Sequence, residues 1–158
     1  MKKNRIIAAL SVLCILSLLA MGLALKRSGD AGGFEPPPFE TAALAGKPEV
    51  PAGLGYQELD AQEFRVGLCG EIRVHDGMAE IWFTNPQGND VWLRLRVADE
   101  EGHVLGQTGL LRPGEYVRYV ALSETTPGMK IGMKVMAYEP EIYHSAGALV
   151  FHTGIAAQ

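Results

Sequence analysis

An uncharged run of 20 residues near the start of the chain, 6–25 (IIAALSVLCILSLLAMGLAL), constrains the architecture more than any other feature. As an α-helix rising about 1.5 Å per residue, such a run matches a bilayer core roughly 30 Å thick. We therefore expect residues 1–27 to form an N-terminal membrane anchor with one transmembrane helix. Because a signal peptide usually has an apolar core of only about 7 to 15 residues, an uncleaved signal anchor is favoured. Secretion after signal cleavage is the alternative.

Basic residues flank this run unequally. Lys2, Lys3 and Arg5 precede it, and Lys26 and Arg27 follow it. Since the cytoplasmic side of a membrane segment carries the excess of Lys and Arg, the short N-terminus is expected in the cytoplasm. The sequence thus predicts a single-pass protein of the cell membrane whose C-terminal domain is extracytoplasmic, at the cell surface.

The body of the chain is acidic. From Ser28 onward nine basic residues face eighteen acidic ones, a net charge of 9 minus 18, or −9. Such a body repels phosphate backbones, so we expect no nucleic-acid partner. Its one cysteine, Cys69, lies in the apolar sequence VGLCG and suits a buried core position better than a reactive thiol, although the sequence leaves both open.

Residues 28–55 are rich in Pro, Gly and Ala and show no apolar periodicity. The run 36–38 (PPP) favours an extended polyproline II conformation of about 3.1 Å per residue. We therefore expect a flexible Pro/Gly-rich linker here that spaces a domain over 56–158 from the bilayer. Phe34 and Phe39 would dock either on this domain or on a partner, and the sequence does not decide between the two.

From Tyr56 onward, short segments alternate apolar and polar residues, which is the pattern of half-buried strands. The clearest is 91–97 (VWLRLRV), whose odd-numbered residues are expected inside and whose Trp92, Arg94 and Arg96 are expected outside. The strands predicted in this way cover 64–74 (broken or bulged at its glycines), 78–84, 91–97, 103–106, 116–122, 129–138 and 146–153.

Turn residues fill the gaps between these segments, for instance in 112–115 (RPGE), where Pro precedes Gly as a type II turn requires. No helical stretch follows the anchor. About seven strands separated by such turns predict an all-β domain, an antiparallel β-sandwich.

The run 85–122 resembles the middle strands of bacterial surface immunoglobulin-like and fibronectin-type modules. It contains a D-x-x-G turn at 99–102 and an L-x-P-G-E sequence at 111–115 that opens the next strand. The resemblance covers about a quarter of the chain, and its motifs are structural. It implies an immunoglobulin-like fold and a surface location, but no activity. The Cys-Trp-Cys core of antibody domains is absent.

The outward row Trp92, Arg94 and Arg96 is the leading candidate for partner binding, because aromatic and Arg side chains are enriched at interfaces. Trp82, which the alternation over 78–84 places on the outward face opposite Ile81 and Phe83, and Tyr143 complete the candidate set. The structural alternative is that Trp82 and Trp92 are cross-strand neighbours covered by Arg stems. Tyr143 belongs to an aromatic-rich connection, 138–144, which forms either a contact loop or a cap on the domain.

No catalytic or cofactor motif stands out. The four histidines are scattered without metal-ligand spacing, and no serine lies in a G-x-S-x-G sequence, so we expect neither a metal site nor an enzyme. The carboxylates of 99–101 and 139–141 fall in predicted turns, where calcium suits them better than catalysis. The sequence thus predicts a noncatalytic, membrane-anchored interaction module that binds a protein or cell-envelope component through a sheet face or a loop end. A carbohydrate-binding or calcium-dependent accessory module is the alternative.

Overall fold

The structure, a computed structural model, describes residues 34–156 and contains ten β-strands and no helix over that range. None of the elements in this range is a helix able to cross a bilayer, and the anchor predicted over 6–25 lies outside the described residues. The strands are β1 (Leu44–Ala45), β2 (Tyr56–Asp60), β3 (Arg65–Cys69), β4 (Arg73–His75), β5 (Met78–Asn85), β6 (Trp92–Ala98), β7 (Val104–Gln107), β8 (Glu115–Ala121), β9 (Lys130–Tyr138) and β10 (Ser145–Gly154).

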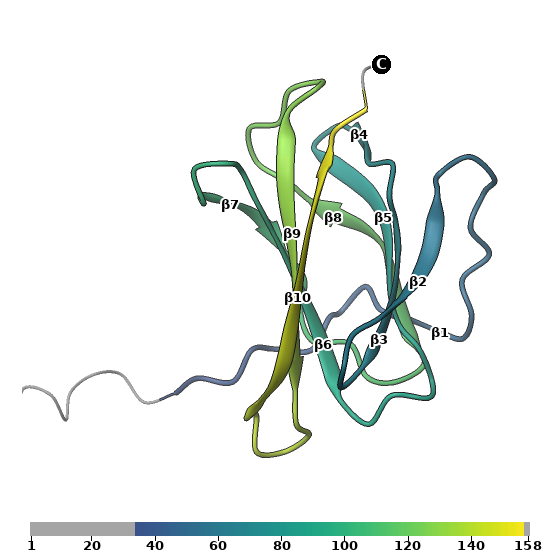
Figure 1. The fold of residues 1–158 in the computed structure, drawn as a ribbon, viewed down its shortest axis with the longest axis vertical. Helices are drawn as coiled ribbons and strands as arrows, with labels where there is room; N and C mark the ends of the chain where they lie inside the picture. The colour runs from purple at the N-terminus through teal and green to yellow at the C-terminus, as the bar shows by residue number, and fades with distance from the viewer. Residues whose placement is uncertain (1–33, 157–158) are drawn as a thin grey trace, which may run out of the picture. The chain divides into compact units, whose positions relative to one another are not determined.

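These strands form two antiparallel sheets. Six strands make one sheet in the order β1-β8-β5-β3-β2, with β4 beside β5, and four make the other in the order β10-β9-β6-β7. Figure 1 shows the two sheets facing each other. Their inward side chains form one hydrophobic cluster, to which the first sheet contributes Leu68 and Phe83 and the second Leu95 and Val135. The predicted all-β class is therefore confirmed, with ten strands where the sequence predicted about seven.

The predicted alternation is confirmed most clearly in the four-stranded sheet. In β6 the side chains of Leu93, Leu95 and Val97 are fully buried, while the residues between them are only half-buried. In β9 the buried positions likewise alternate with half-buried and exposed ones. Because successive side chains of a strand point to opposite faces, this pattern fixes which residues reach the outer face of the sheet.

The additional strands have simple origins. The predicted strand 64–74 ends at Cys69 and resumes as β4, as its glycines suggested. No strand was predicted at the positions of β1 and β2, which precede it. In β5 the pairing with β8 shifts between Glu80 and Phe83, and Trp82 has a positive φ of 52°. The regular alternation of β5 ends at this β-bulge, and the residues from Ile81 to Asn85 are all buried. Trp82 is therefore only 6% exposed, although the sequence predicted it on an outward face.

The turn predicted over 112–115 is present. The amide of Glu115 donates to the carbonyl of Arg112 at 3.0 Å, and Gly114 has a φ of +81°. A positive φ at the third position is what a type II turn requires and what glycine adopts without steric cost.

From Phe39 onward, the segment that was predicted to be a flexible linker is bonded to the domain. The amide of Glu40 donates to the carbonyl of Leu110 at 2.9 Å, β1 pairs with β8, and Leu54 is 1% exposed in the core. The sequence indicated a spacer because the segment is rich in Pro and Gly and lacks apolar periodicity. Even so, a few backbone hydrogen bonds and the buried side chain of Leu54 hold residues 39–55 against the domain. Of the two alternatives for Phe39, docking on the domain is the one observed.

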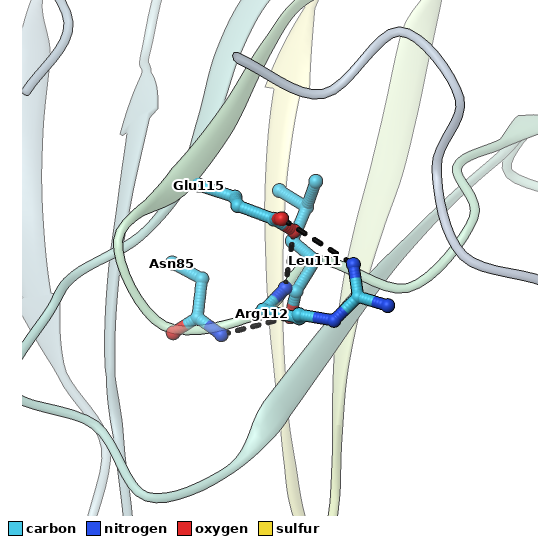
Figure 2. A network of polar contacts seen from close by, with 4 residues as sticks. All are labelled: Asn85, Leu111, Arg112 and Glu115. Carbon is cyan, nitrogen blue, oxygen red and sulfur yellow. Dashed lines mark hydrogen bonds and ion pairs between the residues drawn. The ribbon is translucent and has the colours of Figure 1, made fainter. Parts of the chain in front are cut away.

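A buried polar network joins the loops at one end of the domain. The side-chain amide of Asn85, which is fully buried, donates to the carbonyls of Val91 and Leu111, both at 2.9 Å. Asn89 donates to the side-chain oxygen of Asn85 at 2.7 Å. Figure 2 shows Asn85 beside Leu111, with the carboxylate of Glu115 bonded to Arg112. Since Val91 directly precedes β6, this network fixes where the Trp92 strand begins.

Replacing Asn85 with Ala should therefore destabilise the domain. The change removes the side-chain donor to the buried carbonyl of Val91 and the acceptor of the Asn89 amide, while the carbonyl of Leu111 keeps only its bond from the Leu93 amide. We expect a loss of about 2 to 4 kcal/mol in the free energy of unfolding, measured by chemical denaturation. The matched control is Gln87→Ala in the same loop, where an exposed side chain is removed and the change should stay within about 0.5 kcal/mol. Equal effects of the two substitutions would contradict a structural role for the network.

Candidate functional site

The outer face of the four-stranded sheet carries the predicted row of Trp92, Arg94 and Arg96. All three side chains are half-buried on β6, the strand between β7 and β9. Strand register places Tyr138 opposite Trp92, Met136 opposite Arg94 and Lys134 opposite Arg96. On the next strand, Ala148 and Val150 lie beside Met136 and Lys134. We call these residues the outer face: Trp92, Arg94, Arg96, Lys134, Met136, Tyr138, Ala148 and Val150.

The strands of this sheet carry basic residues and no acidic ones. Its four strands contain two Arg and two Lys and not one Asp or Glu, whereas the chain from Ser28 onward carries −9. The six-stranded sheet, in contrast, has acidic residues on β2, β5 and β8. The outer face is thus a positively charged area on an acidic domain.

The cations of the outer face lack acidic partners. Among residues 34–156, no salt bridge involves Arg94, Arg96 or Lys134. Arg94 is held by a hydrogen bond from its Nε to the carbonyl of Thr108 at 3.0 Å, and the buried Nε of Arg96 has no hydrogen-bond partner. Because Arg96 and Lys134 are direct cross-strand neighbours, their like charges oppose the pairing of β6 with β9.

On the six-stranded sheet, two of the three Arg residues, Arg73 and Arg118 but not Arg65, form salt bridges with carboxylates. Arg118 of β8 pairs with Glu80 at 2.9 Å, and Arg73 of β4 pairs with Glu71 at the same distance. These two Arg residues therefore each have a neighbouring carboxylate, whereas Arg94, Arg96 and Lys134 have none within the part of the chain that the structure describes.

Aromatic residues gather at one end of the row. The ring of Trp92 contacts Phe39 edge-on at 4.8 Å between centroids and Tyr143 at 5.2 Å. The guanidinium of Arg112 lies over the Phe39 ring at 3.7 Å. Tyr143 has a positive φ of 57°, and its amide donates to the carbonyl of Glu139 at 3.0 Å, so the β9–β10 loop folds back on itself. Tyr143 thereby packs against Trp92 at the end of the sheet.

Trp82 is separated from this group, because it belongs to β5 of the other sheet. It stacks on Tyr116 with 6.0 Å between ring centroids, and Arg118 lies 4.9 Å from its ring centre. Its indole N–H donates to Glu80 at 3.1 Å. Trp82 and Trp92 are therefore not cross-strand neighbours, and of the five predicted residues the structure brings together the three of the row and Tyr143.

Residues from β9 and from the predicted linker complete the site. Alternation within 129–138 puts Lys134 and Tyr138 on the face opposite Ile131 and Val135, but nothing in the sequence indicates which strand pairs with β6. Phe39 lies in a segment without periodicity, so its contact with Trp92 had no local signal.

The acidic loop after β6 is tied to its own histidine. One side-chain atom each of Asp99, Glu101 and His103, of the kind that can coordinate a metal ion, lies within 4.8 Å of the other two. However, one oxygen of Asp99 accepts the His103 amide at 2.7 Å, and the other contacts Nδ1 of the ring at 2.8 Å. Both oxygens of Asp99 thus serve the turn between β6 and β7.

Cys69 is buried, with no exposed surface. Burial raises the pKa of its thiol to about 11, and the negative charge of Glu80 adds to this effect. Of the two roles that the sequence left open, the structure has the buried one.

Comparison of the chain with protein-family models, with curated proteins and with solved structures found no match.

The pair of Asp99 and His103 predicts a pH dependence. The hydrogen bond and the charge of Asp99 raise the pKa of His103. Loss of water contact alone would raise the pKa of Asp99, but its bonds with His103 lower it overall. The stability that the charged histidine contributes is complete below its ordinary pKa of about 6.5 and is lost as the pH rises through the raised value.

NMR titration should therefore give His103 a midpoint above the ordinary histidine value of about 6.5. In Asp99→Asn the His103 midpoint should fall. The difference in unfolding free energy between the natural chain and this variant should shrink from pH 6 to pH 8. A midpoint of His103 that Asp99→Asn leaves unchanged would refute the assignment.

Proposed function

We propose that this chain is a noncatalytic interaction module, held in the cell membrane by its N-terminal segment, that binds a partner outside the cytoplasm through the outer face. The observation that carries the proposal is the group of Arg94, Arg96 and Lys134, which lies beside Trp92 without an acidic partner among the described residues. The partner is a protein or a cell-envelope component.

The energetics of the free face support a binding role. Like charges on directly paired residues are destabilising, so Arg96 opposite Lys134 costs the isolated domain stability. A negatively charged partner would relieve this repulsion and gain electrostatic attraction. Arg and aromatic side chains are also the residues that most often dominate binding energy at interfaces.

The position of these side chains on a sheet also favours recognition. Trp92 is held between Phe39 and Tyr143, and Arg94 is held by Thr108, so neither needs extensive ordering when a partner binds. Preorganised contacts of this kind lower the entropic cost of association.

The remaining parts of the proposal rest on the sequence. The length of the uncharged run 6–25 and its basic flanks support a retained anchor with the domain outside. The turn motifs of 85–122, together with two antiparallel sheets around one core, support an immunoglobulin-like sandwich.

Of the two alternatives to a protein partner, carbohydrate is better supported than calcium. The oxygens of Asp99 are already bonded to His103, whereas the outer face offers the rings of Trp92 and Tyr138 beside Arg side chains that have no carboxylate partner within residues 34–156.

Site-specific crosslinking in intact cells tests the proposal. A photo-crosslinking amino acid at Met136, in the middle of the outer face, should capture a specific partner, and the same probe at the exposed Glu58 of the other sheet should not. Arg94→Ala should weaken capture from Met136 by about 2 kcal/mol, or roughly thirtyfold, as expected for a central Arg. Capture from Glu58 alone, or from neither position, would sink the proposal.

A further inference from the structure

We infer that the partner is an acidic polysaccharide, whose carboxylates bind Arg94, Arg96 and Lys134 and whose sugar rings contact Trp92. This inference rests on the proposed function and names the ligand class for the same face. Four features of the face carry it: the spacing of the cations, their free hydrogen-bond donors, the neighbouring aromatic rings and the acidic surroundings.

The three cations are spaced for a polymer. Arg94 and Arg96 are two residues apart on β6, which separates their Cα atoms by about 6.6 Å along the strand. Lys134 lies directly across from Arg96, at a Cβ distance of about 5 Å. A row of positive charges along an open sheet face suits several anionic groups of one extended chain.

The guanidinium groups have donors to offer. Arg94 uses its Nε for Thr108, and no hydrogen bond within residues 34–156 engages its two terminal nitrogens. The Nε of Arg96 is buried without a hydrogen-bond partner, and no hydrogen bond within residues 34–156 engages the terminal nitrogens of Arg96, which are the donors that a nearby anion would meet. Arg binds carboxylates through paired N–H groups, which makes a uronic-acid carboxylate a fitting ligand.

Aromatic rings adjoin these cations. Trp92 precedes Arg94 by two residues on the same face, and Tyr138 is its register partner. Trp and Tyr rings offer an apolar surface together with a polar group, and such a surface suits the C–H face of a sugar. A sugar ring at Trp92 would place the carboxylate of the same or the next sugar toward Arg94.

Acidic groups limit the positive area at both ends of the sheet. Lys130 is neutralised by Glu100 at 3.5 Å, and Glu139 and Glu141 follow Tyr138 in the loop beyond β9. Duplex DNA carries one charge per about 1.7 Å and would meet this acidic surround over most of its length. A glycan with one carboxylate per sugar fits a short basic row on a chain with a body charge of −9.

The test uses the purified full-length chain in a neutral detergent and titrates it with oligogalacturonate by calorimetry. The matched control ligand is the same oligosaccharide with its carboxylates methyl-esterified, which keeps the sugar rings and removes the charge. We expect oligogalacturonate to bind, binding to weaken with added salt because the contacts are ionic, and the ester to bind at least about tenfold more weakly.

Variants locate the binding. Arg96→Gln combined with Lys134→Gln should weaken binding at least about tenfold, while Arg73→Gln, which removes one charge elsewhere, should change it less than about twofold. The double variant should not lower the melting temperature, because it removes a repulsive pair; this measurement separates lost binding from lost folding.

Several results would overturn the inference. Equal binding of the ester, or equal weakening by Arg73→Gln, would show that the carboxylates do not bind at this face. Tighter binding of single-stranded DNA, or of nanodiscs containing phosphatidylglycerol, would assign the face to another polyanion. Specific capture of a protein from Met136, without any oligogalacturonate binding, would reject the glycan and retain the proposed function. Failure of both experiments would reject both.

Discussion

Burial of one apolar face from each sheet in a single core is the constraint on which the rest of this domain depends. Successive side chains of a strand point to opposite faces. Because Leu93, Leu95 and Val97 are buried in the core, the side chains between them must therefore lie on the outer side of the sheet. A slip of one residue in register would bury both Arg side chains and expose the apolar ones. The composition of the outer face is thus set by the core.

The outer surfaces of the two sheets differ in how their Arg side chains are paired. On the six-stranded sheet, Trp82 stacks under Arg118, and Arg118 is neutralised by Glu80. On the same sheet, Gly67 lacks a Cβ where the Tyr56 side chain approaches, so that an aromatic ring covers the strand. On the four-stranded sheet, no acidic side chain of the described residues 34–156 forms a salt bridge with Arg94, Arg96 or Lys134 in the middle of β6 and β9. This contrast distinguishes a structural aromatic–Arg cluster from one available to a partner.

Most of the fold could be predicted from the sequence, because its signals are local. The alternation of 91–97 and 129–138 and the turn at 112–115 depend on neighbouring residues, and all three are present. The bulge at Trp82 and the docking of Phe39 could not be predicted in this way. Both depend on contacts with strands distant in sequence, β8 for Trp82 and β6 for Phe39.

The candidate site was predictable only in part for the same reason. The row on β6 follows from period-two alternation, but its partners follow from pairing with β9, which no local pattern specifies. Trp82 was grouped with Trp92 because both were expected on outward faces, and the sequence did not reveal that β5 and β6 belong to different sheets.

The burial of the Cys69 thiol has a consequence for its reactivity with oxidants. With a pKa of about 11, only about one molecule in ten thousand carries the thiolate at pH 7. Formation of a mixed disulfide or a sulfenic acid needs that thiolate together with access to it, and burial withholds both. The domain can therefore carry an unpaired cysteine without covalent dimers or glutathione adducts forming while it stays folded.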